Sequence, residues 1–187
     1  MDVNNYQPIS VLNVFSKIYE RLAYKRLFKF LEINKIFSER QFGFRTGRST
    51  ETATNLFCKD IIEAFEENSY VLAVFIDLRK AFDTVNHSIL LQKLNHYGVR
   101  GLANSWFSSY LSDRTQYVDL RGASSSEAGI LCGVPHGSIL GPLLFLLYVN
   151  DLLTVSTLLK AILFADDTTL YISGKRIEDL IHTVNVT

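Results

Sequence analysis

The sequence predicts an α+β fold in which helices accompany antiparallel strands, and three observations support this prediction. Residues 71–76 are a continuous apolar run ending at Asp77, which is typical of a central strand buried on both faces. Residues 162–171 place a β-prone run on each side of Asp166 and Asp167, which predicts a hairpin with an acidic tip. Apolar residues recur every three to five positions over residues 11–31, which predicts an amphipathic helix.

The other elements follow from similar patterns. Ser10 is a candidate cap for this first helix, and Ser49 or Thr50 for a helix over residues 51–67. Pro142 fits a first helical turn, where its missing N–H costs nothing. Apolar spacing predicts further helices over 88–97, 100–111, 143–153 and 176–184, and strands over 116–120 and 129–134.

Composition excludes several classes of protein. The chain has 187 residues, of which 48% are hydrophobic, so it can bury a sizeable core. Cys58 and Cys132 lie far apart without a Cys-x-x-Cys spacing, which argues against a zinc site or a disulfide framework, and we expect two buried, reduced thiols. The longest apolar run, 143–149, is too short to span a bilayer, and no signal pattern is present. We expect an intracellular protein, nuclear or cytoplasmic, with no membrane partner.

Charge is unevenly distributed, although the net charge is zero. Residues 1–50 carry nine Lys and Arg against four Asp and Glu, whereas residues 51–187 carry ten against fifteen. The basic part could hold phosphates and the acidic part could concentrate metal ions. The basic residues of 17–29 can equally be the solvated face of a helix, so both interpretations stay open.

Two loops contain candidate binding residues. QFGFRTGRST, residues 41–50, places Arg45 and Arg48 just before a helix N-terminus, which suits phosphate binding, although a solvated surface loop is the alternative. In residues 133–142, two glycines flank His136 and allow the backbone to approach another strand or a ligand.

Asp77, Asp166 and Asp167 indicate a function more strongly together than any of them does alone. Asp77 at the end of a buried strand is costly unless it is paired or binds a metal. If this strand pairs with the hairpin, Asp77 meets Asp166 and Asp167, and clustered carboxylates repel one another unless divalent cations lie between them. Mg²⁺ couples carboxylates to phosphates, and two such ions can activate a 3′-hydroxyl and stabilise leaving pyrophosphate. A solvated Asp-Asp turn remains the alternative.

Three motifs resemble those of reverse transcriptases. VFIDLRKAFD (74–83) resembles motif A, GVPHGSILGPLLF (133–145) motif B and ILFADDTTLY (162–171) motif C. QFGFRTGRST and YQPISVLNVFSKIYERLAYKRL (6–27) are similar to the fingers motifs of non-LTR retrotransposons of the LINE type, Jockey-like elements among them. The resemblance in this order covers almost the whole chain.

The resemblance implies the fingers and palm of a right-hand polymerase, with an antiparallel palm sheet backed by helices and truncated before the thumb. Residues 1–69 would be mainly fingers and 70–187 mainly palm. The implied activity is RNA-directed DNA polymerisation with two Mg²⁺ ions, or Mn²⁺, on an RNA template, a DNA primer and dNTPs. The implied catalytic residues are Asp77, Asp166 and Asp167, which also serve as metal ligands together with the Leu78 carbonyl.

The resemblance also assigns nucleotide-binding residues. Phe82 matches the steric gate against a ribose 2′-hydroxyl, and Arg45, with Arg48 as a second candidate, matches the fingers contact with the triphosphate. The motif B turn that packs against nucleotide and template corresponds to Gly133, Pro135, Gly137 and Ser138. His136 stands where the family usually has Gln. The thumb and an endonuclease are expected on a longer polyprotein.

Two other interpretations stay open. The first is a catalytically inactive, truncated remnant that keeps the fold as a nucleic-acid-binding or interaction module. The intact aspartates favour polymerase ancestry, whereas His136 and the early end of the chain favour the remnant. The second is a group II intron maturase, which an upstream endonuclease in the same transcript would exclude.

Overall fold

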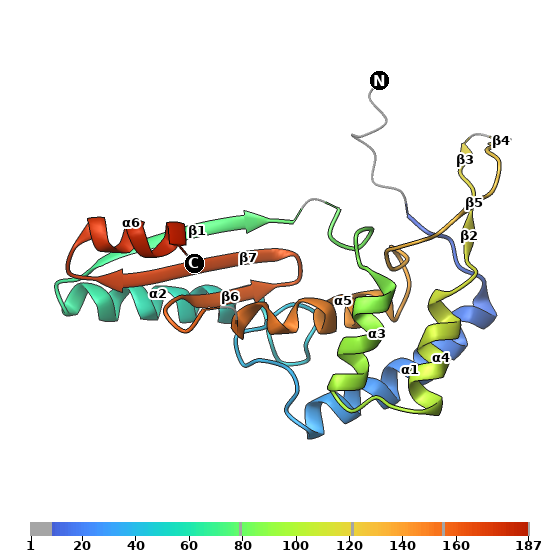
Figure 1. The fold of residues 1–187 in the computed structure, drawn as a ribbon, viewed down its shortest axis with the longest axis horizontal. Helices are drawn as coiled ribbons and strands as arrows, with labels where there is room; N and C mark the ends of the chain where they lie inside the picture. The colour runs from blue at the N-terminus through green and yellow to red at the C-terminus, as the bar shows by residue number, and fades with distance from the viewer. Residues whose placement is uncertain (1–8, 79, 121, 155, 187) are drawn as a thin grey trace. The chain divides into compact units, whose positions relative to one another are not determined.

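The computed structural model describes residues 9–78, 80–120, 122–154 and 156–186. The chain forms two compact units, each made of two separated stretches of sequence. We call residues 31–79 and 149–187 the sheet unit, and residues 1–30 and 80–148 the helical unit. Both contain helices and antiparallel strands (Figure 1), which confirms the α+β prediction. The units interleave along the chain, and the division into fingers before residue 70 and palm after it stays a prediction.

The sheet unit is built around three antiparallel strands in the order β1-β7-β6. These are β1 (Tyr70–Asp77), β6 (Lys160–Phe164) and β7 (Asp167–Gly174). Helix α2 (Thr50–Glu66) packs on β1 and β6, and α6 (Ile177–Val186) packs on β1 and β7. The 3₁₀-helix η2 (Asn150–Thr154) precedes β6. The core beneath α2 consists of Phe42, Ala53, Ile162 and Tyr171.

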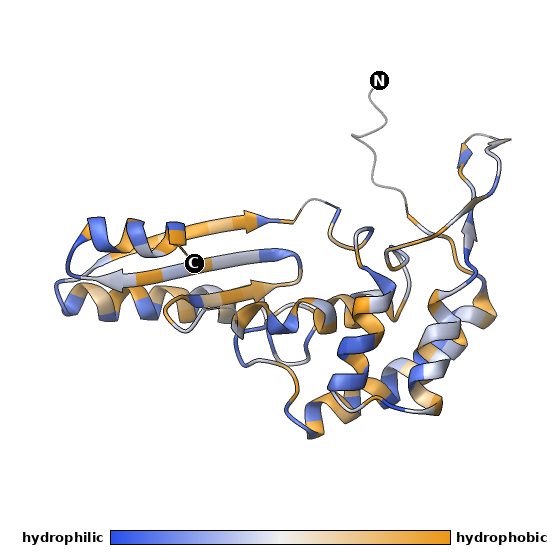
Figure 2. Cartoon of the chain, viewed as in Figure 1, coloured by the Kyte–Doolittle hydropathy of each residue, from blue (hydrophilic) through white to orange (hydrophobic). Residues whose placement is uncertain are grey.

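The prediction that residues 71–76 form a central strand buried on both faces was wrong. Strand β1 lies at the edge of the described sheet, and the Phe75 side chain is 71% exposed. Figure 2 shows that β1 is hydrophobic over most of its length all the same. The central strand is β7, whose polar threonines gave a weaker signal. Hydrophobicity predicts a strand, but the order of strands depends on which backbones pair.

Side-chain caps decide where two helices begin. Ser49 caps α2: its Oγ accepts from the Thr52 amide at 3.2 Å, and Thr52 Oγ1 accepts from the Ser49 amide at 2.9 Å. This confirms Ser49 as the cap. Helix α1 (Val14–Ile33) begins later than predicted, because Asn13 rather than Ser10 supplies the cap, its Oδ1 accepting from the Ser16 amide at 3.1 Å.

The helical unit contains most of α1, together with α3 (His87–His96), α4 (Leu102–Leu111) and most of α5 (Gly141–Val149). Lys93 of α3 donates to the Tyr148 carbonyl of α5 and lies over the Tyr148 ring. The predicted strands over 116–120 and 129–134 are shorter than expected. Two two-stranded antiparallel sheets form instead, from β2 (Thr115–Gln116) with β5 (Ala128–Gly129) and from β3 (Asp119–Leu120) with β4 (Ala123–Ser124).

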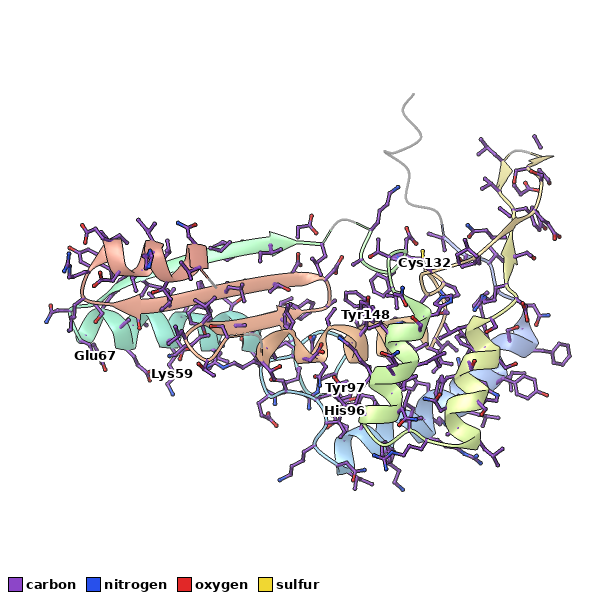
Figure 3. The ribbon with its side chains drawn as sticks, viewed as in Figure 1. Lys59, Glu67, His96, Tyr97, Cys132 and Tyr148 are labelled. Carbon is purple, nitrogen blue, oxygen red and sulfur yellow. The ribbon has the colours of Figure 1, made fainter. Side chains whose placement is uncertain are left out.

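Several predicted core positions are exposed. On α1, Leu27 and Leu31 are buried, but Leu22 is 57% exposed and borders, with Trp106 of α4, an open apolar cavity of about 640 Å³. Cys58 and Cys132 are both exposed, the latter in the segment that follows β5 (Figure 3), so the expectation of buried thiols was wrong. Among the described helices, none is long and apolar enough to cross a membrane.

Candidate active site

The acidic hairpin of the sheet unit is a two-residue turn between β6 and β7. Phe164 pairs with Asp167, and Ala165 and Asp166 form the turn between them. Ala165 has a φ of +59°, a left-handed conformation that costs about 1 kcal/mol for a residue with a Cβ atom. Asp166 is half-buried, whereas Asp167 is exposed. The predicted hairpin with an acidic tip is therefore confirmed.

Strand register brings two of the predicted aspartates opposite each other. In the antiparallel β1–β7 pair, Asp77 is the cross-strand partner of Asp167. Side chains that face each other across two strands share one face of the sheet, and like charges in this position repel. Asp166 lies one residue earlier, in the turn, and Leu78 directly follows β1. The structure thus brings together the neighbourhood that the sequence predicted from residues far apart in the chain.

These residues suit a hard cation by their chemistry. Carboxylate and carbonyl oxygens are the ligands that Mg²⁺ prefers, and Asp77, Asp167 and Asp166 supply carboxylates at one end of the sheet. Among the described residues, however, no three or more His, Cys, Asp or Glu side chains are grouped closely enough to hold a metal ion. In the described part of the chain, the structure therefore provides an opposed pair of carboxylates and an adjacent third one, without an assembled three-carboxylate cluster.

A small cavity of about 210 Å³ adjoins Asp167 within the sheet unit. The first turns of α2 and the ends of the strands line it, with Thr50, Thr54 and Thr169 as polar groups and Phe57 and Phe75 among the apolar ones. Alternation along β7 places Asp167, Thr169 and Tyr171 on the same face of the sheet, the face that packs on α2.

The two arginines of residues 41–50 are held by other protein groups. Arg45 is ion-paired to Glu32 at 3.2 Å and donates to the Ser38 carbonyl at 2.7 Å, so that only 8% of its side chain is exposed. Arg48 is ion-paired to Glu39 and lies 5.2 Å from the centre of the Phe42 ring. The structure therefore gives both arginines a role in fixing this loop, and their predicted role in triphosphate binding stays a prediction.

The other predicted nucleotide-binding residues meet in the helical unit. Phe82 lies edge-on to His136 and stacks on Phe145, with ring centres 4.7 Å apart in each pair. The Val134 amide donates to the Phe82 carbonyl at 2.8 Å. A side chain on Gly133, whose φ is +88°, would lie 2.8 Å from the Asp83 carbonyl oxygen. The ends of the sequences resembling motifs A and B are thus joined by backbone contacts.

The turn around His136 is closed by its own polar groups. Ser138 Oγ donates to the Pro135 carbonyl at 2.8 Å and accepts from the Gly141 amide at 2.8 Å. Gly137 has a φ of +96°, which only glycine adopts readily. The His136 carbonyl accepts from the Ser10 amide at 2.8 Å. Pro135, His136, Gly137 and Ser138 therefore form one ordered turn within the helical unit.

A part-buried ionic network under α2 was not predicted from the sequence. The Asp60 carboxylate accepts from the Tyr171 hydroxyl at 2.5 Å and is ion-paired to Arg40 at 3.3 Å and Lys160 at 3.4 Å. The spacing of Ala53, Phe57, Asp60 and Ala64 could have revealed that Asp60 needs partners, though not which ones, because it places a carboxylate on the apolar face of a helix.

This network shifts the pKa of its members. Burial by itself raises the pKa of Asp60, but the Tyr171 hydrogen bond and the charges of Lys160 and Arg40 outweigh it and lower that pKa. Burial, reinforced by the bond to Asp60, raises the pKa of the Tyr171 hydroxyl to about 12. For Arg40, burial lowers the pKa, but the contacts with Tyr171 and Asp60 raise it overall.

The comparisons with known proteins agree on one protein family. A family model described as reverse transcriptase (RNA-dependent DNA polymerase) matches residues 2–187. In Drosophila melanogaster, the probable RNA-directed DNA polymerase from transposon BS is 40% identical over 154 residues, which are 79% of this chain and 16% of that protein. The RNA-directed DNA polymerase from mobile element jockey is 33% identical over 183 residues, or 94% of this chain and 20% of that protein. The chain thus spans a fifth or less of these relatives.

Two solved structures have a similar fold. The apo telomerase of Candida tropicalis, truncated from its C-terminal domain, has a TM-score of 0.60 and 13% identity, covering 94% of this chain and 40% of that one. The telomerase of Candida albicans, in complex with a fragment of telomeric RNA, has a TM-score of 0.55 and 15% identity, covering 93% and 33%. At this identity the likeness concerns the fold alone, and it agrees with the fingers and palm that the sequence predicted.

Proposed function

This chain belongs to the reverse transcriptase family, and we propose that it is the RNA-directed DNA polymerase domain of a non-LTR retrotransposon. The relatives described above are transposon polymerases, which favours this function over that of a group II intron maturase. The observation that carries the proposal is the pairing of Asp77 with Asp167 beside the Ala165–Asp166 turn. Two carboxylates opposed at a strand end are unfavourable without a cation.

In the proposed reaction, Asp77, Asp166, Asp167 and the Leu78 carbonyl would hold two Mg²⁺ ions, or Mn²⁺. Bound cations at this position would neutralise the charge that develops as a primer 3′-hydroxyl displaces pyrophosphate. Arg45 and Arg48 would contact the triphosphate after giving up Glu32 and Glu39, their partners in the structure. Phe82 and the turn of Pro135, His136 and Gly137 would contact the sugar and base of the dNTP. The finer roles of these residues follow from the family resemblance.

The partners implied by this proposed function are an RNA template, a DNA primer and dNTPs. The relatives are long polypeptides, of which this chain matches 16 to 20%. We therefore propose that a thumb and an endonuclease lie on a longer polyprotein encoded by the same element. An element that copies RNA into DNA within a cell requires an intracellular enzyme, in the nucleus or the cytoplasm.

Primer extension tests the proposal. Asp77→Asn and Asp166→Asn, made in the polypeptide as its gene encodes it, should each lower kcat on an RNA template by at least about 10²-fold, with little change in KM. Asp113→Asn is the matched control, because Asp113 is an exposed aspartate of the helical unit and should leave extension unchanged. Near-normal kcat in either of the first two variants contradicts the proposal.

A catalytically inactive remnant is the second candidate, and two observations favour it. The Arg45 guanidinium is already bound inside the protein, and His136 replaces the Gln that the family usually carries. The variant His136→Gln distinguishes a working polymerase from an inactive remnant. A working polymerase should change its extension rate by less than about tenfold, whereas a remnant decayed at this position should gain activity from an undetectable level.

A further inference from the structure

The loop before α2 is joined to the acidic hairpin through the backbone. The Phe42 amide donates to the Leu163 carbonyl at 2.8 Å, and the Leu163 amide donates to the Arg40 carbonyl at 2.9 Å. Gln41 and Leu163 thus form a parallel bridge along β6. These bonds fix the end of β6 two residues before the turn that contains Asp166.

Gly43 touches the turn itself. A Cβ atom on Gly43 would lie 2.2 Å from the Ala165 amide nitrogen and 2.9 Å from the Ala165 Cα, where ordinary contacts begin at 3.4 Å. Both neighbours are backbone atoms, so a side chain cannot be accommodated by rotating another side chain. Any residue larger than glycine must push the turn away by about 1 Å or more, a distance that matters for catalytic geometry.

Gln41 holds Gly43 in this position. Its side chain is fully buried, and its Oε1 accepts from the Gly43 amide at 2.8 Å. Its Nε2 has no hydrogen-bond partner among the described residues. An unpaired buried donor costs about 1–3 kcal/mol, so stability alone does not favour glutamine here.

The loop is also anchored at both ends. Asn150 Oδ1 accepts from the Ser38 amide at 3.2 Å, and its Nδ2 donates to the Ile36 carbonyl at 2.9 Å. Arg45 donates to the Ser38 carbonyl and is ion-paired to Glu32. A loop fixed in this way can oppose movement of Ala165, whose left-handed backbone needs support from its surroundings.

We propose that Gly43 and Gln41 are positioning residues that fix the Ala165 backbone and thereby the carboxylate of Asp166. The inference rests on the proposed function, in which Asp166 is a metal ligand. Gly43 sets the distance between loop and turn, and Gln41 keeps Gly43 against the turn. Neither residue touches the reacting atoms in this role.

Gly43→Ala is the principal test, in the polypeptide as its gene encodes it. We expect kcat for primer extension to fall about 10²-fold, with KM for dNTP and the Kd for primer-template nearly unchanged. Gly47→Ala is the control in the same loop: open space surrounds that position, so its φ of +75° adds a left-handed backbone cost but no contact with the turn. Gly129→Ala is a second control, with open space and no positive φ. Both controls should keep kcat within about threefold of the wild type.

Gln41→Met is the second variant, and it keeps the proposal testable if Gly43→Ala fails to fold. Methionine removes the unpaired Nε2 donor but leaves the Gly43 amide without its acceptor, so one unpaired donor replaces another and the two effects on stability nearly cancel. We expect an unchanged urea midpoint but a kcat at least about tenfold lower. A midpoint and a kcat that fall together would indicate ordinary core packing, and would contradict the proposal.

Mn²⁺ binding measured by electron paramagnetic resonance gives a readout that does not need catalysis. Gly43→Ala should weaken Mn²⁺ binding and speed hydrogen exchange of the Leu163 amide, whereas Gly47→Ala should change neither. If Gly43→Ala changes neither, or leaves kcat unchanged, the positioning role is wrong. If Asp77→Asn keeps its activity, the proposed function is wrong, whatever the Gly43 variants do.

Discussion

The sheet unit and the helical unit arrange their predicted site residues by different physical means. In the sheet unit, Asp77 and Asp167 are opposed because β1 and β7 pair in one register, and a shift by one residue would turn one of the two away. In the helical unit, Phe82 and His136 meet through turns, glycines and ring contacts rather than through paired strands. Strand pairing tolerates side-chain substitution because its hydrogen bonds join backbone atoms. A close backbone contact at a glycine, by contrast, is lost when a single methyl group is added.

Each unit also buries one carboxylate beside a tyrosine. In the sheet unit, Asp60 accepts from Tyr171 and is ion-paired to Arg40 and Lys160. In the helical unit, Glu20 accepts from the Tyr110 hydroxyl at 2.8 Å and from the Ile139 amide at 2.6 Å. The hydrogen-bond partners described for Glu20 are thus neutral, and the Arg114 cation contacts Tyr110 rather than Glu20, whereas the partners of Asp60 include two cations. Removing the tyrosine hydroxyl should therefore lower the free energy of unfolding more in the helical unit than in the sheet unit.

The largest expected effect on stability concerns the contact between Gly133 and Asp83 in the helical unit. Gly133→Ala should lower the free energy of unfolding by about 3 kcal/mol, because it adds a left-handed backbone cost to an overlap with Asp83. Gly122→Ala is the control, with a φ of +84° and open space around it, so it should cost only about 1 kcal/mol. Urea denaturation measures both, and equal losses would show that the Asp83 contact does not matter.

The next effect is on the ion pairs of the buried Asp60 carboxylate in the sheet unit. Asp60→Asn should cost about 2 kcal/mol at neutral pH, because hydrogen bonds to a charged group are lost. A lowered folded pKa gives stability that is present above the ordinary value of 3.8 and is lost as the pH falls through the folded pKa. Wild-type stability should therefore fall more steeply in acid than that of Asp60→Asn. Parallel acid profiles would contradict this.

Substitution of Phe82 tests whether the ring cluster of Phe82, His136 and Phe145 also selects deoxyribose over ribose. Because a ring beside the sugar leaves no volume for a 2′-hydroxyl, Phe82→Val should raise the ratio of rNTP to dNTP incorporation by about tenfold. The measurement is single-nucleotide extension with matched dNTP and rNTP. A ratio that stays at the wild-type value would make Phe82 a core residue, held by Phe145 and His136, with no role in selectivity.

The smallest expected effect is the difference between the two tyrosines. Tyr110→Phe should cost about 1 kcal/mol more than Tyr171→Phe, because Glu20 keeps only the Ile139 amide as its described partner while Asp60 keeps two cations. Paired urea denaturation curves compare the two variants. A greater loss in Tyr171→Phe would reverse the proposed difference between the units.

Alkaline titration checks the same two tyrosines independently. Burial raises the pKa of both hydroxyls to about 12, above the usual 10.0. A raised pKa gives stability that is present below pH 10 and is lost as the pH rises through about 12. Each Phe variant should remove one late-titrating phenol from the ultraviolet titration. A variant that removes only a phenol of ordinary pKa would contradict the environment described for that tyrosine.

The sequence by itself determined most of the helices, the three strands of the sheet unit and the acidic tip. Residues 162–171 predicted a hairpin because two β-prone runs flank turn residues, and Ser49 marked the start of α2 because its hydroxyl can satisfy a free amide. Such signals are local, involving residues within one turn or one strand. The sequence raised the pairing of Asp77 with the hairpin only as a condition, since it showed that a carboxylate at a strand end needs a partner or a metal but not which strand lies beside it.

Only the tertiary structure decided which strand is central, which thiols and apolar side chains are exposed, and where Arg45 finds its partners. It also showed that Gly43 lies against Ala165 and that Asp60 meets Tyr171. These contacts join residues more than a hundred positions apart, and hydrophobic periodicity carries no information about such pairs. Local patterns set which segments form helices and strands, whereas long-range backbone pairing and close packing set which side chains meet.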